Sequence, residues 1–278
     1  MKISNHKLTE EFAKFEKTNK TSGNFKSGLP DTIVIHYTAG PSLQSAINTF
    51  KDSSVSASAH IVVDFDGSIT QLIPFKKVGW HAGRSSWLDR SGLNHYSIGI
   101  EIVNAGQLEK GENDWRSWFG KSYSEDEVIQ AVHRNQSEPT WWHRFTEEQI
   151  TAVFDLCKEL MNTYDIRYIL GHEEISPGRK VDPGPAFPLD KIRERLLETD
   201  RRDDDHNETD KPISRGIVNT SALNIRSGPS AGTQTIASPL SRNTELQILD
   251  EQNGWYQAEV KVRGWVSKQF VDEIDEQQ

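Results

Sequence analysis

The sequence predicts an α/β domain with a central mixed β-sheet flanked by helices, followed by a small all-β barrel. Between residues 30 and 198, short β-branched runs alternate with segments of helical periodicity, a pattern typical of strands covered by helices. From residue 215 to 274 the chain has short β-like runs separated by turn residues. Residues 199–214 hold six acids, three bases and a single aliphatic residue, so we expect a linker there.

Length and composition exclude some classes of protein. The chain has 278 residues, which fits a core domain plus a smaller module. Its net charge of -9 and pI of about 5.5 argue against nucleic acid as a partner, because phosphate neutralisation needs a basic surface. Cys157 is the one cysteine, so no intrachain disulfide can form.

No targeting segment is visible in the sequence. Residues 1–20 are charged throughout and lack the apolar core of a secretory signal. No stretch approaches the roughly 20 apolar residues of a membrane span. We therefore expect a chain that is cytoplasmic as synthesised and has no transmembrane segment, unless a signal has been removed from it.

The first domain begins with a polar lead-in over residues 1–29. Phe12 and Phe15 in this segment either pin a short helix or belong to a frayed arm. The β-branched run of residues 31–38 predicts a strand that carries His36 near its end.

A helix and a hairpin follow the first strand. Ser42 is positioned to cap a helix that runs to about Lys51, with apolar residues at helical spacing. The runs at residues 59–64 and 68–73, separated by Asp66-Gly67, predict a β-hairpin.

The strand over residues 94–103 contains an unusual acidic residue. Its side chains alternate, so Ile98, Ile100 and Ile102 face one side while Glu101 faces the other. A carboxylate in mid-strand is costly unless something pairs with it. From the strand alone, Glu101 is either a sheet residue that is exposed or ion-paired, or a functional group.

Residues 104–145 form an insertion that holds half of the tryptophans, namely Trp115, Trp118, Trp141 and Trp142. Ser124 and Glu127 make a capping box that predicts a short helix. The insertion is either a satellite hydrophobic cluster under a long loop, or a wall or lid over a neighbouring cleft, because long loops inside domains are often functional.

Two helices complete the domain. Thr146 begins a capping box, and the apolar stripe that follows as far as Tyr164 predicts a long amphipathic helix. Cys157 lies on that stripe, and we expect an inert core thiol. Residues 189–198 predict a closing helix.

The segment from Tyr168 to Pro188 packs His172, Lys180 and Asp182 into eleven residues. Its four prolines and three glycines predict a shaped loop, entered through a short buried strand. Imidazole and carboxylate are ligands of a borderline-soft divalent metal, and a catalytic zinc site needs three protein ligands. His36 from the first strand supplies the third ligand.

Three motifs of the first domain resemble those of a known family. They are IHYTAG with His36, SIGIEIVN with Glu101, and GHEEISPGRKVDPG with His172, Lys180 and Asp182. The order and spacing are similar to those of the zinc-dependent N-acetylmuramoyl-L-alanine amidases of the amidase-2 type, which include the peptidoglycan recognition proteins. The resemblance implies a Zn²⁺ cofactor held by His36, His172 and Asp182. It also implies that Glu101 and Lys180 are catalytic, as general base and as oxyanion stabiliser.

Four further residues lie in segments that resemble the same family, and we expect them to bind substrate. His60 lies in an SxxH-type strand, Trp80 and His81 lie in GWHAG, and Asn94 begins the predicted strand that carries Glu101. Alternatives exist for both histidines. His60 is otherwise a buried, hydrogen-bonded side chain, and His81 otherwise packs within its loop.

The C-terminal segment resembles a bacterial SH3-like (SH3b) domain through LNIRSGPS, NGWYQAEV and RGWVSKQFV. This module is often joined to cell-wall hydrolases, so the implied role is to hold the enzyme near peptidoglycan. We expect at least one of Trp255 and Trp265 to pack inside the barrel.

The resemblance implies hydrolysis of the amide bond between N-acetylmuramic acid and L-alanine in peptidoglycan or in muropeptides. One alternative is a non-catalytic peptidoglycan-binding protein with a vestigial zinc site. Another is a cytoplasmic recycling amidase for soluble anhydro-muropeptides, which the missing signal favours, whereas the SH3-like module favours intact wall. Release by lysis or a non-standard export route would reconcile the two.

Overall fold

The computed structural model describes residues 1–9, 13–197, 214–252 and 254–261. The chain divides into two compact units, Met1–His206 and Asn207–Gln278, and each is described by itself. The predicted linker and the run at residues 264–266 lie outside the described residues, apart from Ser214. Among the residues that are described, no helix is both long and apolar enough to cross a membrane.

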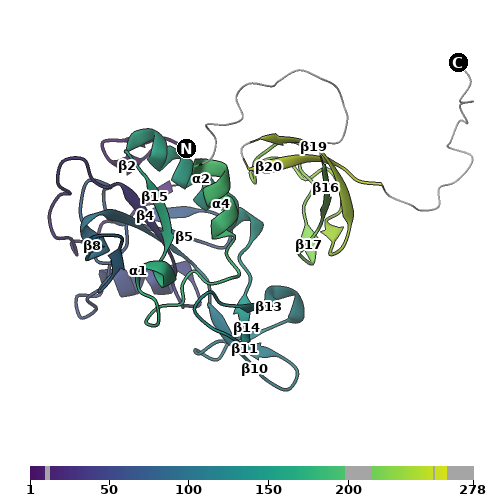
Figure 1. The fold of residues 1–278 in the computed structure, drawn as a ribbon, viewed down its shortest axis with the longest axis horizontal. Coiled ribbons are helices and arrows are strands. Elements are labelled where there is room, and N and C mark those ends of the chain that lie inside the picture. The colour runs from purple at the N-terminus through teal and green to yellow at the C-terminus, as the bar shows by residue number, and fades with distance from the viewer. Residues whose placement is uncertain (10–12, 198–213, 253, 262–278) are drawn as a thin grey trace, which may run out of the picture. The chain divides into compact units, whose positions relative to one another are not determined.

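A six-stranded mixed sheet forms the centre of the first unit (Figure 1). Its strands lie in the order β15 (Tyr168–Gly171), β4 (Thr32–Tyr37), β9 (Ser97–Ile102), β5 (Ile61–Val63), β6 (Ile69–Gln71) and β3 (Ala13–Phe15). Only the β5–β6 pair is antiparallel. This pair is the predicted hairpin, and the mixed sheet confirms the predicted fold class.

Helices cover both faces of this sheet. On one face, α2 (Glu147–Thr163) and α4 (Leu189–Leu197) pack over a core that includes Ile98, Ile100 and Ile102. On the other face, α1 (Leu43–Lys51) packs against Val62 and Val103. All six residues of β9 are buried, as expected for a strand covered on both sides.

The predicted helix starts are confirmed. The Ser42 side chain accepts a hydrogen bond from the Ser45 backbone N–H at the start of α1. Thr146 and Gln149 form the capping box of α2. Cys157 is fully buried on α2, where burial raises the pKa of its thiol to about 12, so it is the inert core thiol that we expected.

The N-terminal segment differs from the prediction. Instead of a helix or a frayed arm, β1 (Ile3–Ser4) and β2 (Lys7–Leu8) form a hairpin, and β3 joins the edge of the main sheet. Leu8 is buried, and its backbone N–H donates to the Gln71 side chain. Strands this short carry no readable period and form only because a neighbouring edge is available. Phe12 lies outside the described residues.

The insertion is a second sheet, which corrects the long loop that both interpretations assumed, whereas the satellite hydrophobic cluster of the first interpretation is present. Its strands, with β12 at one edge and β13 at the other, are β12 (Ser122–Tyr123), β11 (Trp115–Arg116), β10 (Gln107–Lys110), β14 (Pro139–His143) and β13 (Val128–Val132). A satellite core includes Leu108 and Tyr123, and η2 (Glu125–Glu127) carries the predicted capping box. The strands are only two to five residues long, so their alternation is too short to reveal the sheet in the sequence.

Smaller elements complete the unit. They are β7 (Ser86–Trp87), β8 (Arg90–Ser91), η1 (Leu93–His95) and the short helix α3 (His172–Ile175). The helix α3 corrects the prediction that His172 lies in a purely irregular loop. The strand that leads into it, β15, is confirmed.

The second unit contains two small sheets. One has the order β16 (Ser214–Ile217), β19 (Glu245–Gln252) and β20 (Trp255–Glu259), and the other pairs β17 (Ala222–Leu223) with β18 (Leu240–Ser241). Val218 and Ile248 are buried in this unit. Trp255 is half-buried at the start of β20, and Trp265 lies outside the described residues.

Candidate metal centre

Three adjacent parallel strands end at the same edge of the main sheet and bring the predicted site together. In the β4–β9 pair His36 lies opposite Glu101, and in the β15–β4 pair Gly171 lies opposite Ile35. Because residues paired across parallel strands point to the same face, Glu101 and His36 are neighbours. His172 follows directly after β15.

The side chains of His36, His172 and Asp182 converge on one point. The Nδ1 atoms of the two histidines and Oδ2 of Asp182 lie 2.9 Å from one another along all three sides of a triangle. All three residues are buried, with 1%, 3% and 7% of their surface exposed. Burial opposes ionisation of Asp182, but its contacts with His172 and His36 outweigh burial and lower the pKa of its carboxyl.

A chain of hydrogen bonds fixes which nitrogen of His36 faces the cluster. Nε2 of His81 lies 3.1 Å from the Ser97 carbonyl, which can only accept, so this nitrogen carries the proton. The bare Nδ1 of His81 then accepts from Nε2 of His36 at 3.0 Å. Burial and the neighbouring His172 lower the pKa of His36 to about 4. His36 is therefore neutral at pH 7 and turns the lone pair of Nδ1 toward the cluster.

His172 is oriented in the same way by a backbone carbonyl. Its Nε2 lies 3.1 Å from the carbonyl of Ala82, so in the neutral ring the lone pair is on Nδ1. The guanidinium of Arg179 is 3.3 Å from the same Nε2, but it donates at shorter distances to Ala82, Arg84 and Ser176. A histidine that uses its second nitrogen on a carbonyl or another ring is typical of metal ligation.

The donor set fits a divalent metal ion. Two imidazole nitrogens and a carboxylate oxygen, with no proton between the rings, repel one another unless a cation lies among them. The centre of a triangle with 2.9 Å sides is about 1.7 Å from each corner, shorter than the roughly 2.0–2.2 Å of zinc bonds to nitrogen and oxygen, so the three donor atoms are close enough together to share one ion. Three protein ligands also leave a position open, as catalytic sites require.

Glu101 lies beside this cluster with an unsatisfied carboxylate. The residue is 8% exposed, and within the described part of the chain its buried Oε2 has no hydrogen-bond partner. Burial and then the charge of Asp182 raise the pKa of Glu101 well above its usual value, and Lys180 opposes that rise. A buried carboxyl oxygen without a partner is rare in structural positions and is available to a water or a substrate proton.

Lys180 is half-buried on the loop between His172 and Asp182, which we call the metal loop. Its charge acts on the pKa of both His36 and Glu101, which places the ammonium group within electrostatic reach of the cluster. Among the described residues, none forms a salt bridge with the Lys180 ammonium. The next residue back, Arg179, ties this loop to Ala82 and Arg84.

The other predicted site residues are placed differently. His60 is fully buried, and its nitrogens bond to the Gly99 N–H and the Lys77 carbonyl, so its ring has no polar atom left for a substrate. Asn94 accepts hydrogen bonds from the backbone N–H groups of His81 and Ala82. These residues support the centre from behind, and substrate contact by them stays a prediction.

Trp80 lies nearer the surface than the two histidines. It is half-buried, and its Nε1 donates to the Ser22 hydroxyl at 2.6 Å. Its role in substrate binding also stays a prediction.

Gly99 leaves the space that His81 occupies. A Cβ atom added at Gly99 would lie 2.3 Å from Cγ of His81, closer than any real contact. The backbone N–H of Gly99 also donates to His60. The space that a side chain at position 99 would need is therefore filled by the imidazole ring of His81, which lies behind His36.

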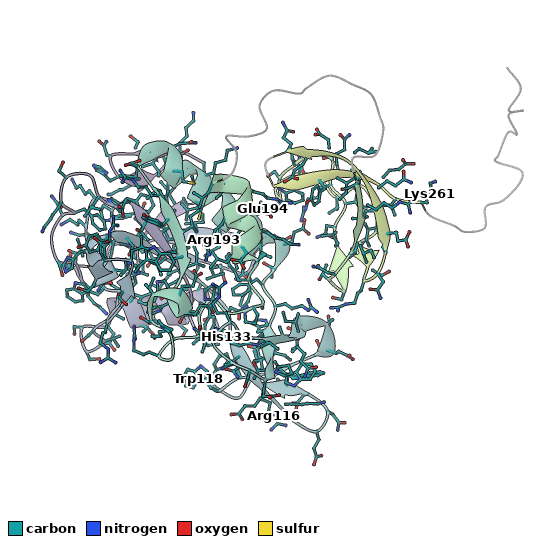
Figure 2. The ribbon with its side chains drawn as sticks, in the orientation of Figure 1. Arg116, Trp118, His133, Arg193, Glu194 and Lys261 are labelled. Carbon is teal, nitrogen blue, oxygen red and sulfur yellow. The ribbon has the colours of Figure 1, made fainter. Side chains whose placement is uncertain are left out.

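Sequence reasoning missed a second buried cluster, which joins the insertion to the metal loop. Nε2 of His133 lies 2.6 Å from Oε2 of Glu173, and both side chains are buried. The same oxygen accepts from the Gly184 N–H, and the Glu173 N–H donates to the Asp182 carbonyl. His133, which is labelled in Figure 2, stacks on Trp142 with 5.5 Å between ring centroids. No motif marks His133, because the contact spans 40 residues.

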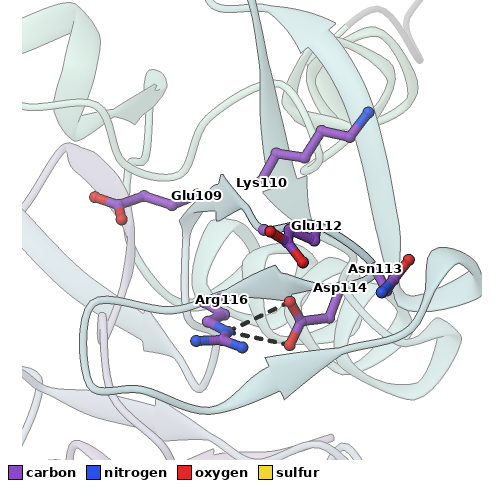
Figure 3. Close-up of a pocket in the computed structure, with 7 residues that line it drawn as sticks. Glu109, Lys110, Glu112, Asn113, Asp114 and Arg116 are labelled. Atoms are coloured by element: carbon purple, nitrogen blue, oxygen red, sulfur yellow. Dashed lines mark hydrogen bonds and ion pairs between the residues drawn. The ribbon is translucent and has the colours of Figure 1, made fainter.

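A cavity of about 590 Å³ lies away from the metal centre, on the hairpin of β10 and β11 (Figure 3). Glu109, Lys110, Glu112 and Arg116 are among the residues that line it, and Arg116 pairs with Asp114. None of the metal-centre residues lines it. We assign it no role in the chemistry.

A buried cluster of two imidazoles and a carboxylate beside an unpaired glutamate, at the edge of a mixed sheet, is the kind of site that metal-dependent hydrolases use. A family model described as N-acetylmuramoyl-L-alanine amidase matches residues 26–185, and a bacterial SH3 domain model matches residues 221–272. The first match covers more than half of the chain. The chain therefore belongs to the amidase-2 family of N-acetylmuramoyl-L-alanine amidases, as the motifs predicted.

Individual relatives agree with this assignment. The chain is 32% identical over 172 residues to the N-acetylmuramoyl-L-alanine amidase AmiD of Escherichia coli K12, covering 59% of this chain and 52% of AmiD. It is 30% identical over 138 residues to the 1,6-anhydro-N-acetylmuramyl-L-alanine amidase AmpD of the same organism, covering 49% and 56%. The chain thus spans about half the length of these curated relatives. A crystal structure of a selenomethionine derivative of AmpD matches the fold, with a TM-score of 0.50 and 23% identity over 70% of this chain and 99% of that chain.

Proposed function

We propose that this chain is a zinc amidase that hydrolyses the bond between N-acetylmuramic acid and L-alanine in peptidoglycan or its fragments. The observation that carries the proposal is the convergence of three donor atoms beside the unpaired carboxylate of Glu101. Two histidines and one aspartate match the ligand types of catalytic zinc. The names of the curated relatives support the choice of bond.

Glu101 is the proposed general base and acid. When bound, the metal polarises the scissile carbonyl and lowers the pKa of a water to about 7. Glu101, opposite His36 in the sheet, accepts the proton of the attacking water and delivers it to the amine of L-alanine as the bond breaks. A positioned group in this role contributes roughly 10²- to 10⁴-fold to the rate. A cation held by His36, His172 and Asp182 would also favour the ionised form of Glu101, which burial disfavours.

Lys180 is the proposed stabiliser of negative charge on the scissile carbonyl oxygen. Its ammonium acts electrostatically on both His36 and Glu101, and no salt bridge within the described residues neutralises it. A fixed cation in a partly dry site stabilises charge that develops in the transition state.

The chain organisation we propose follows the sequence. Residues 30–198 carry the chemistry, with residues 104–145 inserted, residues 199–214 link the domains, and residues 215–274 hold the enzyme near peptidoglycan. Trp80 at the half-buried surface is the predicted substrate contact that is best placed, whereas His60 and His81 act through neighbouring groups.

A non-catalytic binding protein is the main alternative from another class. A binder has no use for a complete ligand set or for an unpaired buried carboxylate, and both are present here. A recycling amidase for soluble anhydro-muropeptides differs from a wall hydrolase only in substrate, so one experiment distinguishes all three.

The experiment is mass spectrometry of products from purified sacculi and from soluble anhydro-muropeptide. Each substrate is incubated with the native protein, with the protein after chelation and zinc reconstitution, and with Glu101→Gln. We expect stem peptides that begin at L-alanine, lost on chelation, restored by zinc and absent with the variant. The better substrate chooses between wall hydrolysis and recycling. Binding to sacculi without release of any peptide would overturn the enzyme proposal and leave a recognition protein.

A further inference from the structure

The insertion presents one tryptophan to solvent next to the metal centre. Trp118, in the turn between β11 and β12, is 75% exposed (Figure 2). Its Nε1 donates to the carbonyl of Ala39 at 2.7 Å. Ala39 is only three residues after His36, so their Cα atoms are at most about 11 Å apart.

The other tryptophans of the insertion pack against residues within it. Trp142 is fully buried and stacks on His133, and Trp115 and Trp141 pack against each other with 5.1 Å between centroids. Trp118 instead meets the edge of Phe119 at 5.7 Å and leaves most of its ring in water. Its indole nitrogen already has a partner, so the hydrogen bond holds the ring in place without burying it.

A ring held in this way is ready to bind. An exposed aromatic side chain with a fixed orientation loses little conformational entropy when a ligand stacks on it. Its surroundings are polar, since Arg116 and Lys121 beside it are exposed. A single apolar ring among charges is too small for a stable protein interface, which needs a contiguous patch. It matches one sugar ring, which has an apolar C–H face and a polar rim.

We propose that Trp118 is a stacking platform for a sugar of the glycan strand that extends from the muramic acid at the metal centre. This inference rests on the proposed function, which places a muramic acid beside His36. The hydrogen bond from Trp118 to the Ala39 carbonyl holds the ring close enough to the metal ligands for a short glycan to reach both. Trp118 is thereby a specificity-determining residue that favours glycan-linked stem peptides over single muropeptides.

The test compares two soluble substrates that differ only in glycan length. One is a muramoyl peptide with a single sugar, and the other carries the same peptide on a tetrasaccharide. Steady-state kinetics are measured for the native protein, for Trp118→Ala and for Trp118→Phe. The matched control is Leu88→Ala, because Leu88 is a comparably exposed apolar residue at 71% in the turn between β7 and β8.

We expect Trp118→Ala to raise KM for the tetrasaccharide substrate roughly five- to tenfold, as loss of one aromatic contact predicts, with kcat unchanged. KM for the single-sugar substrate stays at the native value, Trp118→Phe keeps most of the preference, and Leu88→Ala changes neither. An equal loss on both substrates would mean that Trp118 only supports the Ala39 loop, and this would overturn the proposal. So would an absence of effect on either substrate.

A binding experiment separates this proposal from the proposed function. Peptide-free glycan oligosaccharides are titrated into Glu101→Gln protein with and without Trp118→Ala, by calorimetry. Weaker binding with Trp118→Ala supports the platform even if the native protein releases no peptide. Equal binding with and without the Trp118 ring refutes it, whatever the activity of the native protein.

Discussion

Nε2 of His133 and Oε2 of Glu173 are 2.6 Å apart in a fully enclosed contact between the insertion and the metal loop. Glu173 follows the ligand His172; its backbone N–H donates to the Asp182 carbonyl and its side chain accepts from the Gly184 N–H, so it contacts the residues on both sides of Pro183. The insertion therefore supports the loop segment that carries the ligand Asp182. Arg134 adds a second contact to Glu173 at 3.0 Å.

We expect His133→Ala to weaken both folding and metal binding. Removing His133 takes a buried hydrogen-bond partner from Glu173, at a cost of about 1–3 kcal/mol, while Arg134 and the Gly184 N–H still compensate the Glu173 carboxylate. A displaced Asp182 should weaken metal affinity by roughly 10- to 100-fold, as for other supporting contacts. Chelator competition measures the affinity and urea denaturation the stability. His133→Gln should recover part of both. Unchanged metal affinity in a destabilised His133→Ala would show that the contact is structural only.

Metal removal should leave the first unit folded but less stable. The sheet that carries the ligands is held by backbone hydrogen bonds, so circular dichroism should change little on chelation. A ligand that binds only the folded state adds about 4 kcal/mol when its free concentration is 1,000 times Kd. Asp182→Asn should abolish this metal-dependent gain in thermal scans. An equal gain in Asp182→Asn would place the metal elsewhere.

Glu101→Gln should lower kcat by roughly 10²- to 10⁴-fold, because the amide keeps the shape but cannot take up a proton. Metal content should stay at the native level, since Glu101 is not one of the three converging ligands. Glu109→Gln is the matched control, as Glu109 is exposed on β10. Loss of metal together with activity would mean that Glu101 supports the ligands instead of the chemistry.

His81→Ala should weaken metal binding by roughly 10- to 100-fold through the orientation of His36. Without the acceptor at 3.0 Å from Nε2 of His36, the lone pair of Nδ1 is no longer fixed toward the cluster. His81→Asn retains an acceptor and should restore part of the affinity in chelator competition. His95→Ala is the control, because His95 is exposed. If both His81 variants bind metal as tightly as the native protein, the ring only fills space.

Stability should fall as the pH decreases from about 6.5 to 4. Burial is the main cause that lowers the pKa of His60 and of His143 to about 4, whereas an unfolded histidine titrates near 6.5. Between these values the unfolded chain binds more protons, so each histidine reduces stability by up to about 1.4 kcal/mol per pH unit as pH falls. The contribution of His60 and His143 to folding stability is fully present above about pH 7. Urea midpoints from pH 4.5 to 7.5 measure the slope. His143→Gln should flatten it, and an unchanged slope would contradict the assignment.

The sequence predicted the parts of the fold that local patterns encode. The Thr146 capping box and the β-branched strand ending in His36 were read correctly because caps and strand periodicity are short-range signals. The insertion sheet was missed because the partners of its strands are distant, as in the pairing of Gln107 with Trp142. Residues 1–29 were missed for the same reason.

The candidate site shows the same difference between local signals, which the sequence reveals, and long-range contacts, which it does not. His36, His172 and Asp182 were found by ligand chemistry, and the structure brings them together. The parts that orient them were not visible, because a hydrogen bond from His36 to His81, or from His133 to Glu173, depends on contacts across 40 residues or more. His60 carries no mark in the sequence to distinguish a buried support from a substrate contact.

The missing side chain at Gly99 bears on how active and inactive members of such a family are told apart. A chain that keeps both histidines, the aspartate and the glutamate but has a larger residue at this position would have to displace His81 and with it the ring of His36. A search that scores only the metal ligands would classify that chain as an enzyme. Natural variants or engineered libraries are therefore better screened on the ligands and on this glycine together, although the glycine touches neither metal nor substrate.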